Sequence, residues 1–216
     1  MKYLILTGGT VQPDFARLYL QQHSFDCVLA ADKGIEAADL LKVPVDVLLG
    51  DFDSADHAVL HGWLDRPGLQ VVRHNPVKDQ TDTELAIRYA IEHGADEIHI
   101  LGCTGTRMDH MLGTIQSLKC ALDSGVSCNL ADPHNRIRLL SPGTHRISRS
   151  ETFGRFYSLI PLTERVSGVF LSGMKYPLHD ASFTIGNSLG VSNEIIAQEA
   201  VVSFSSGILI EICSED

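Results

Sequence analysis

Short apolar runs alternate with amphipathic segments through the first 130 residues of the chain. Short apolar runs that end in polar or turn residues are typical of strands buried on both faces of a sheet. The predicted strands are Tyr3–Leu6, Cys27–Ala31, Val45–Leu49, Leu69–Arg73, Glu97–Leu101 and Ser127–Ala131. Helical periodicity between them predicts helices near Asp14–Gln22, Ile35–Leu41, Ala55–Leu64, Asp82–His93 and Asp109–Asp123. This alternation predicts a doubly wound, mostly parallel, Rossmann-like sheet.

The segment Asp82–His93 has the clearest helical pattern. Its apolar residues recur on one face at a period of about 3.6 residues. These residues are Leu85, Ala86, Tyr89 and Ala90. Thr81 and Glu84 form a capping-box pattern at its start, and Gly94 suits the left-handed position that follows a helix.

From about Asn135 onward the helical periodicity disappears and short β-prone runs follow one another. Turn signals such as Pro142-Gly143 and Ser206-Gly207 separate the runs. The predicted strands are Arg136–Leu140, Phe156–Ile160, Arg165–Leu171, Ala200–Phe204 and Ile208–Ile212. Short strands with turns every ten residues or so are typical of a small β-sandwich. We therefore expect an α/β domain over residues 1–137 and an all-β domain over residues 138–216.

Composition narrows the class of protein. The chain of 216 residues carries 17 basic and 27 acidic residues, for a net charge of −10, which disfavours binding to a nucleic-acid backbone. No stretch approaches the roughly 18 apolar residues of a membrane span, and no signal peptide is visible. The five cysteines include no CxxC pair, which is typical of free thiols in a reducing compartment. We expect a cytoplasmic protein with neither a nucleic-acid partner nor a membrane segment.

Two polar clusters that follow predicted strands carry carboxylates. In an open α/β sheet, ligands bind at the carboxyl ends of the strands. Asp51 and Asp53 stand two positions apart on what we expect to be an extended segment, so their side chains point the same way. Like charges so close raise one carboxyl pKa unless a cation lies between them, and such oxygens suit Mg²⁺. The alternative is an aspartate that caps a helix beside an unrelated neighbour.

The other acidic loop follows the strand Cys27–Ala31. Its Asp32 and Lys33 suit a ribose or a phosphate, although, taken alone, the pair is better explained by a helix cap with a solvated lysine.

Two further clusters open helices, where the helix dipole favours anions. Lys78 and Asp82 lie around the start of the clearest helix, and Asp82 is a candidate third carboxylate for the same cation. The segment 102–110 (GCTGTRMDH) combines glycines, threonines and Arg107, which suit phosphate oxygens, but it matches neither a Walker A nor a GxGxxG pattern. The four clusters together predict an Mg²⁺-dependent phosphate-transfer or phosphate-hydrolysis site.

The ordered motifs resemble those of thiamine pyrophosphokinases. The four motifs of the first half are 31–34 (ADKG), 50–54 (GDFDS), 78–82 (KDQTD) and 102–110 (GCTGTRMDH). Two more follow in the second half, at 172–178 (SGMKYPL) and 188–194 (SLGVSNE). The resemblance spans nearly the whole chain. It implies transfer of the β,γ-pyrophosphoryl group of ATP to the hydroxyl of thiamine, giving thiamine diphosphate and AMP.

The resemblance also implies roles for individual residues. Asp51, Asp53 and Asp82 would be the catalytic residues that bind Mg²⁺. The ATP-binding residues would be Asp32, Lys33, Lys78, Asp79, Thr81, Thr104, Gly105, Arg107, Asp109 and His110. The thiamine-binding residues would be Tyr176, Ser188, Ser192 and Asn193, in a pocket between the subunits of a homodimer. Animal members carry tryptophan at the position of Tyr176, and a smaller ring stacks less strongly.

Three alternatives compete with this assignment. A phosphatase of the haloacid dehalogenase type also has an Asp-x-Asp motif after an apolar strand, but it has threonine or valine where this chain has Ala55. A pyrophosphokinase for a pterin alcohol does not explain Tyr176 or the pair Ser192-Asn193. A non-catalytic nucleotide or thiamine sensor has no need for three mutually repelling carboxylates.

Overall fold

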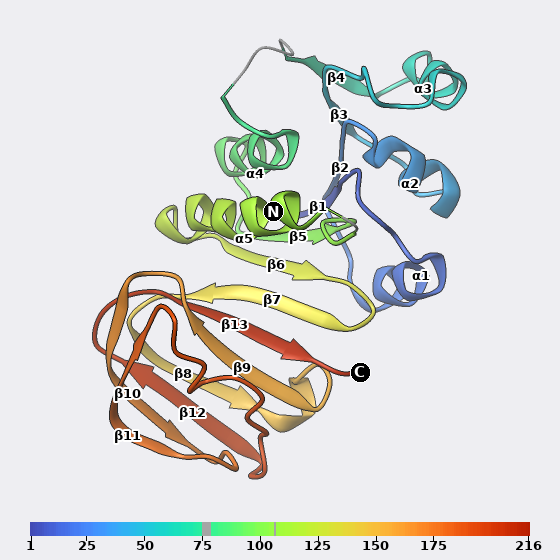
Figure 1. Cartoon of the computed structure of the whole chain (residues 1–216). Coiled ribbons are helices and arrows are strands. Elements are labelled where there is room, and N and C mark those ends of the chain that lie inside the picture. Colours follow the sequence, from blue (N-terminus) through green and yellow to red (C-terminus); the bar gives the residue numbers. More distant parts are fainter. Residues whose placement is uncertain (75–78, 106) are drawn as a thin grey trace. The chain divides into compact units, whose positions relative to one another are not determined.

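The chain divides into two compact units, Met1–Pro133 and His134–Asp216. The computed structural model describes residues 1–74, 79–105 and 107–216. Helices and parallel strands build the first unit, whereas antiparallel strands dominate the second (Figure 1).

A parallel sheet forms the centre of the first unit. Its strands are β1 (Lys2–Leu6), β2 (Cys27–Ala31), β3 (Val47–Gly50), β4 (Gln70–Arg73), β5 (Glu97–Leu101) and β6 (Ser127–Ala131). They lie in the order β4-β3-β2-β1-β5-β6, and each neighbouring pair is parallel. Along the chain, β2, β3 and β4 are added one after another on one side of β1, and β5 and β6 are then added on its other side. The switch point, where ligands bind in this class of sheet, therefore lies between β1 and β5.

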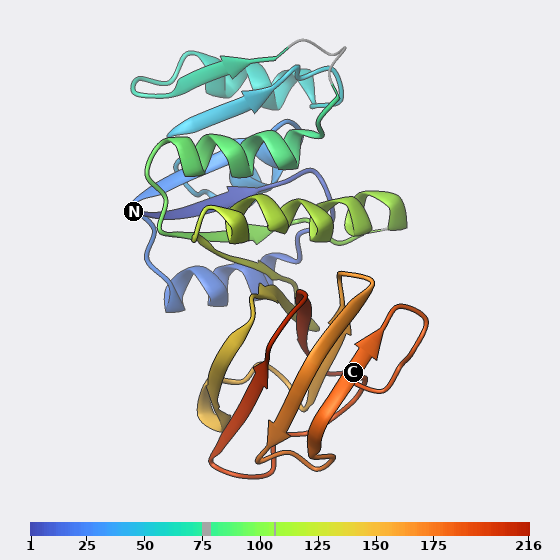
Figure 2. The ribbon, with the colours of Figure 1, turned by 90° about the vertical axis from the view of Figure 1, so that its left-hand side faces the viewer.

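Helices cover both faces of this sheet. They are α1 (Pro13–Gln22), α2 (Gly34–Leu41), α3 (His57–Leu64), α4 (Asp82–Glu92) and α5 (Met108–Asp123). α2 packs between α1 and α3, and α4 packs against α5. Figure 2 shows α4 and α5 in front of the sheet. The predicted doubly wound sheet is confirmed. No helix in the described part of the chain is long and apolar enough to cross a membrane.

Burial on both faces explains why the strands are almost continuously apolar. Leu4 and Leu6 are fully buried in a core formed with α1, α2 and α3. Ile5 between them is also fully buried, and so is Ile87 of α4. A strand with helices on both sides has no solvent-facing positions, which is why its sequence shows runs rather than alternation.

The predicted ends of α4 are confirmed in part. The Thr81 hydroxyl accepts a hydrogen bond from the Glu84 backbone N–H at 3.2 Å, as expected for a cap. The Glu84 carboxylate pairs with Arg88 (2.9 Å), so it does not complete a capping box through that oxygen. Gly94, just after the helix, adopts a left-handed φ of 81°.

The second unit is a β-sandwich, as predicted. Its strands are β7 (Asn135–Leu140), β8 (Gly143–Ser148), β9 (Phe156–Pro161), β10 (Arg165–Ser172), β11 (Leu178–Thr184), β12 (Glu199–Phe204) and β13 (Leu209–Ser214), with a 3₁₀ turn at Arg149–Glu151. β13 lies between β7 and β9, and β11-β10-β12-β8 form a second layer. Tyr157, Leu209, Val202 and Phe183, which come from both layers, share one buried core.

The sequence pattern missed β8 and β11, and both are edge strands of the four-stranded layer. An edge strand of a small sandwich buries few side chains: β8 has one buried residue, Ile147, and β11 has one, Phe183. With so few buried positions, neither segment shows the apolar alternation on which strand prediction depends.

The start of α2 depends on a glycine. A Cβ on Gly34 would lie 2.0 Å from the Leu6 carbonyl oxygen of β1, which is backbone and has little room to move. Gly34→Ala is therefore expected to destabilise the chain by about 1–3 kcal/mol or more in urea unfolding followed by circular dichroism. Gly62→Ala is the matched control, because a Cβ there meets nothing within 4 Å inside α3. It should leave stability unchanged or raise it by up to about 1 kcal/mol. Equal stability of the two variants would contradict the packing described here.

Candidate active site

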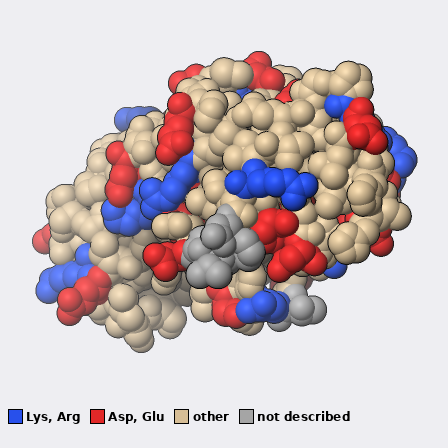
Figure 3. All heavy atoms as spheres, turned by 90° about the horizontal axis from the view of Figure 1, so that it is seen from above, with Lys and Arg blue, Asp and Glu red and all other residues tan. Residues whose placement is uncertain are grey.

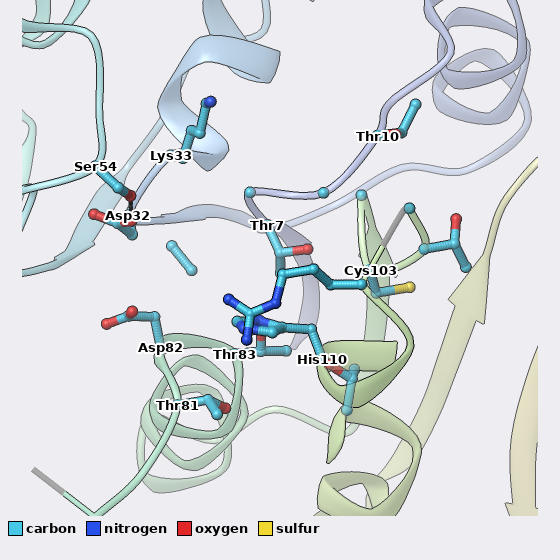
Figure 4. Close-up of a pocket in the computed structure, with 18 residues that line it drawn as sticks. Thr7, Thr10, Asp32, Lys33, Ser54, Thr81, Asp82, Thr83, Cys103 and His110 are labelled. Carbon is cyan, nitrogen blue, oxygen red and sulfur yellow. Dashed lines mark hydrogen bonds between the residues drawn. The ribbon is translucent and has the colours of Figure 1, made fainter. Parts of the chain in front are cut away.

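A polar cavity of about 550 Å³ opens in the first unit at the carboxyl ends of β1, β2 and β5 (Figure 4). Glycine, threonine, serine and charged residues make up most of its lining. The predicted site residues that line it are Asp32, Lys33, Thr81, Asp82, Thr104, Gly105, Arg107 and His110. The residues predicted for an anionic ligand are thus largely gathered around one cavity at the switch point.

Some predicted residues lie elsewhere. Asp51 and Asp53 are next to Asp32 rather than in the lining itself. Asp79 is exposed before α4, and Asp109 is exposed at the start of α5. Lys78 lies outside the described residues.

Two loops form part of the cavity wall by pairing through their backbones. The Gly9 N–H donates to the Gly102 carbonyl (2.7 Å), and the Thr10 N–H donates to the Thr104 carbonyl (2.8 Å). A Cβ on Gly9 would lie 2.2 Å from the Gly102 oxygen, so this approach requires glycine. The lining segment 7–10 was not among the predicted site residues, although it has the same pattern as the loop after β5, with glycines directly after an apolar strand.

Three carboxylates meet beside the cavity. Asp32, Asp51 and Asp53 each place one oxygen within 4.8 Å of the other two. The expected extended segment is wrong, because β3 ends at Gly50 and the chain then turns. Phe52 has a left-handed φ of 65°, and the Asp53 N–H donates to Asp51 Oδ1 at 3.2 Å. The turn, rather than strand alternation, brings the two side chains together.

Neither capping alternative explains these aspartates. The cap of α3 is Asp56, whose carboxylate accepts hydrogen bonds from the Ala58 and Val59 backbone N–H groups. The cap position of α2 is Lys33, without a side-chain cap bond. Helix capping therefore does not explain the side chains of Asp32, Asp51 and Asp53.

Like charge dominates the electrostatics of this cluster. The pKa of Asp53 is raised, first by its hydrogen bond with Asp51 and then by the negative charges of Asp51, Asp32 and Asp82. Figure 4 shows Asp32 and Asp82 on the same side of the cavity. On the face shown in Figure 3, acidic and basic side chains are interspersed. The repulsion at Asp53 is therefore local to a few neighbouring carboxylates.

The cluster has the chemistry of a divalent-cation site. Its donors are carboxylate oxygens, which Mg²⁺ prefers. Asp32 Oδ1 is buried and has no hydrogen-bond partner within the described residues, while Oδ2 accepts a hydrogen bond from the Ser54 hydroxyl. A buried carboxylate oxygen without a partner is costly, and a cation would satisfy it. Asp32, which we predicted to bind ATP, therefore lies closer to the predicted metal ligands than sequence alone indicated.

A second charged pair lies at the start of α5. Arg107 donates to Asp109 twice, from Nε (3.2 Å) and from Nη2 (2.6 Å). The guanidinium of Arg107 and the His110 backbone N–H lower the pKa of Asp109 to about 2. Arg107 lines the cavity and Asp109 does not, so Asp109 holds the guanidinium in place.

Two family models match the chain and together span most of it. The thiamin pyrophosphokinase catalytic domain matches residues 18–130, and the thiamin pyrophosphokinase vitamin B1 binding domain matches residues 144–209. The chain belongs to the thiamine pyrophosphokinase family. The resemblance drawn from the motifs is confirmed, and with it the assignment of the chain as an enzyme of this family.

Individual members of the thiamine pyrophosphokinase family agree. Thiamine pyrophosphokinase of Bacillus subtilis (strain 168) is 37% identical over 216 residues, which cover 98% of each chain. A crystal structure of the Bacillus subtilis protein superposes with a TM-score of 0.90 at 34% identity and full coverage of both chains. That of thiamin pyrophosphokinase from Geobacillus thermodenitrificans gives a TM-score of 0.85 at 31% identity, covering 100% of this chain and 98% of the other.

In this thiamine pyrophosphokinase family member, Tyr176, Ser192 and Asn193 lie close together in the second unit. Asn193 is buried, and its side chain accepts a hydrogen bond from the Tyr176 N–H (3.0 Å) and donates one to the Tyr176 carbonyl (2.9 Å). The Ser192 N–H donates to the Ser158 hydroxyl (2.9 Å). Tyr176 is 57% exposed, so Asn193 fixes the backbone of a residue whose side chain is accessible.

Ser188 is the fourth predicted thiamine-binding residue. It is exposed, and its carbonyl accepts a hydrogen bond from the Val191 N–H (3.0 Å) in the loop that leads to Ser192.

The proximity of the carboxylates can be tested by titration. Because Asp51 raises the pKa of Asp53, Asp51→Asn should lower the Asp53 pKa toward the ordinary aspartate value of 3.8. The measurement is the pH dependence of the carboxyl ¹³C shift of Asp53 in the metal-free protein. Asp123→Asn, which removes a carboxylate paired with Lys119 on α5, should leave the Asp53 pKa unchanged. An Asp53 pKa that does not move in Asp51→Asn would contradict the cluster.

Proposed function

We propose that the chain transfers the pyrophosphoryl group of ATP to thiamine and releases thiamine diphosphate and AMP. Membership of the thiamine pyrophosphokinase family supports the reaction type. The observation that carries the proposal is the polar cavity at the switch point with carboxylates beside it. A polyphosphate with its cation needs this combination of hydroxyl groups, glycine backbone, positive side chains and nearby acids.

The nucleotide would be held mainly through its phosphates. The segments 7–10 and 102–105 supply glycines, so the backbone can approach phosphate oxygens closely, and threonines that offer hydroxyl groups. Arg107 donates Nε and one hydrogen of Nη2 to Asp109, which leaves Nη1 and the other Nη2 hydrogen as two parallel donors for a pair of phosphate oxygens. Lys33 and His110 lie in the same lining. Asp79 and Thr81, which come just before α4, remain candidates, and Lys78 remains one from its place in the sequence.

Asp32, Asp51 and Asp53 would hold Mg²⁺, with Asp82 as a further carboxylate of the site. The cation would neutralise charge on the transferring phosphates. The like-charge repulsion that raises the Asp53 pKa is a cost that a divalent cation would offset.

The reaction forms a bond between the thiamine hydroxyl oxygen and the β-phosphorus of ATP. The bond between that phosphorus and the α–β bridging oxygen breaks, the oxygen leaves with AMP, and the proton of the thiamine hydroxyl is released. Carboxylates engaged with a cation are weak bases, so the protein would act chiefly by aligning the hydroxyl with the phosphorus. Tight hydrogen bonding in the two cavity loops suits this role.

The second unit would bind thiamine, with Tyr176 stacked on one of its rings and Ser188, Ser192 and Asn193 around it. We propose a homodimer in which this pocket lies at the subunit interface. All five cysteines are free thiols, and this state is typical of the reducing cytoplasm, where we place the reaction.

The first experiment incubates the purified protein with ATP, Mg²⁺ and thiamine and follows AMP, ADP and inorganic phosphate separately. AMP should form one-for-one with thiamine diphosphate. Asp51→Ala and Asp82→Ala should each lower kcat/KM by about 100-fold or more, because the charge of the cation site is disrupted. Asp123→Ala on α5 is the matched control and should retain full activity.

Other products would contradict this proposal in distinct ways. ADP with thiamine monophosphate would mean that the γ-phosphoryl group moves. Free phosphate produced without regard to thiamine would support a phosphatase. Binding without turnover would support a sensor.

The role of Tyr176 gives a separate prediction. Aromatic stacking contributes about 0.5–1.5 kcal/mol beyond area burial, so Tyr176→Ala should raise the KM for thiamine about two- to tenfold. Tyr176→Trp should lower it. The KM for ATP should be the same in both variants, and Tyr176→Phe serves as the control that keeps the ring. A thiamine KM that is unchanged in Tyr176→Ala would show that thiamine does not stack on this residue.

A further inference from the structure

The Asp32 carboxylate has one engaged oxygen and one unengaged oxygen. Oδ2 accepts a hydrogen bond from the Ser54 hydroxyl, which a dashed line marks in Figure 4. Oδ1 is buried, and the described residues provide no hydrogen-bond partner for it. The same carboxylate comes within 4.8 Å of ligand oxygens of Asp51 and Asp53. The hydrogen bond from Ser54 therefore affects the orientation of the Asp32 carboxylate relative to Asp51 and Asp53.

The backbone of Asp32 has little freedom to move. Its N–H donates to the Leu49 carbonyl of β3 at 2.7 Å, and its φ is 47°, in the left-handed region. A Cβ on Gly50 would lie 3.1 Å from the Asp32 Cα, so the two loops are in close contact. With the backbone held in this way, the remaining freedom of Asp32 is rotation of its side chain. A hydrogen bond to one carboxylate oxygen sets that rotation.

Ser54 is itself held by the residues on either side of it. Phe52 and Ala55 are 3% and 5% exposed and belong to the core beneath α2 and α3. The Asp56 N–H donates to Glu36 Oε1 of α2 at 3.0 Å. Ser54 itself is exposed, and these anchors on either side of it hold the backbone that brings its hydroxyl to Asp32.

We propose that Ser54 is a positioning residue for the cation site: its hydroxyl donates to Asp32 Oδ2 and so orients Oδ1 toward the cation shared with Asp51 and Asp53. The inference rests on the proposed function and names a residue that this function needs. Hydrogen bonds to metal-ligating carboxylates orient the ligand, and their loss typically weakens metal binding by about 10- to 100-fold. Without the hydroxyl, the Asp32 carboxylate would also face the other acids unrestrained.

The test measures cation affinity directly as well as activity. In the metal-free protein without nucleotide, titration with Mn²⁺ followed by electron paramagnetic resonance should give a dissociation constant about tenfold higher for Ser54→Ala than for wild type. In the thiamine assay, the half-saturating Mg²⁺ concentration should rise by a similar factor, with kcat at saturating Mg²⁺ within about twofold of wild type. Ser54→Thr keeps the hydroxyl and should restore both quantities.

Ser124→Ala is the matched control. The Ser124 hydroxyl donates to the Cys120 carbonyl (2.9 Å) at the end of α5, so the same chemical change is made away from the cluster. It should alter neither Mn²⁺ affinity nor Mg²⁺ dependence. Thermal unfolding checks that each variant folds, and Ser54→Cys, nearly isosteric and a weaker donor, replaces Ser54→Ala if the alanine variant does not fold.

Two results would overturn the inference. One is an unchanged Mn²⁺ affinity in the folded Ser54 variant, including a variant that loses kcat at saturating Mg²⁺, because Ser54 would then act on the substrates. The other is a wild-type protein that does not bind Mn²⁺. A wild-type protein that binds Mn²⁺ through Ser54 but makes no thiamine diphosphate would support the inference and reject the proposed function.

Discussion

The close approach of the loops that follow β2 and β3 is the constraint on which the site depends. It is made by backbone: the Asp32 N–H bonds to the Leu49 carbonyl at 2.7 Å, and Gly50 leaves the room. Asp32 and the pair Asp51 and Asp53 are thereby placed together although Asp51 follows Asp32 by 19 positions in the sequence. A larger residue at Gly50 would push the loops apart and disperse the carboxylates.

Concentrating like charge in this way works against the folded state, and the surrounding structure offsets it. Phe52 and Ala55 anchor one loop in a core shared with α2 and α3, and Asp32 lies at the end of a fully buried strand. Asp53 is exposed and Asp51 partly so, which lets solvent or a cation screen them, whereas Asp32 Oδ1 is buried. A packed apolar core therefore supports a cluster of carboxylates whose mutual repulsion disfavours folding. This arrangement is common at functional sites.

In the second unit, too, one residue fixes the local geometry and another is accessible to a ligand. The buried Asn193 uses both ends of its amide on the backbone of Tyr176, and the aromatic ring remains accessible. The residue that fixes the backbone is thus distinct from the residue whose ring is accessible to a ligand. In the first unit, Asp109 and Arg107 stand in the same relation, and Ser54 and Asp32 form a third pair of this kind.

Local patterning was enough to determine the elements, and therefore the fold class: continuous apolar runs predicted β1 to β6, and Thr81 and Gly94 predicted the ends of α4. Ordered motifs determined the family, because the order and spacing of their residues can be read directly from the sequence.

Tertiary structure alone decided three other features. The edge strands β8 and β11 bury too few side chains to leave a pattern. The grouping of Asp32 with Asp51 and Asp53 follows from the pairing of β2 with β3, since strand order is set by long-range contacts that no local pattern records. The hydrogen bond of Ser54 to Asp32 arises from the turn at Phe52, where the backbone leaves the extended path that the sequence predicted.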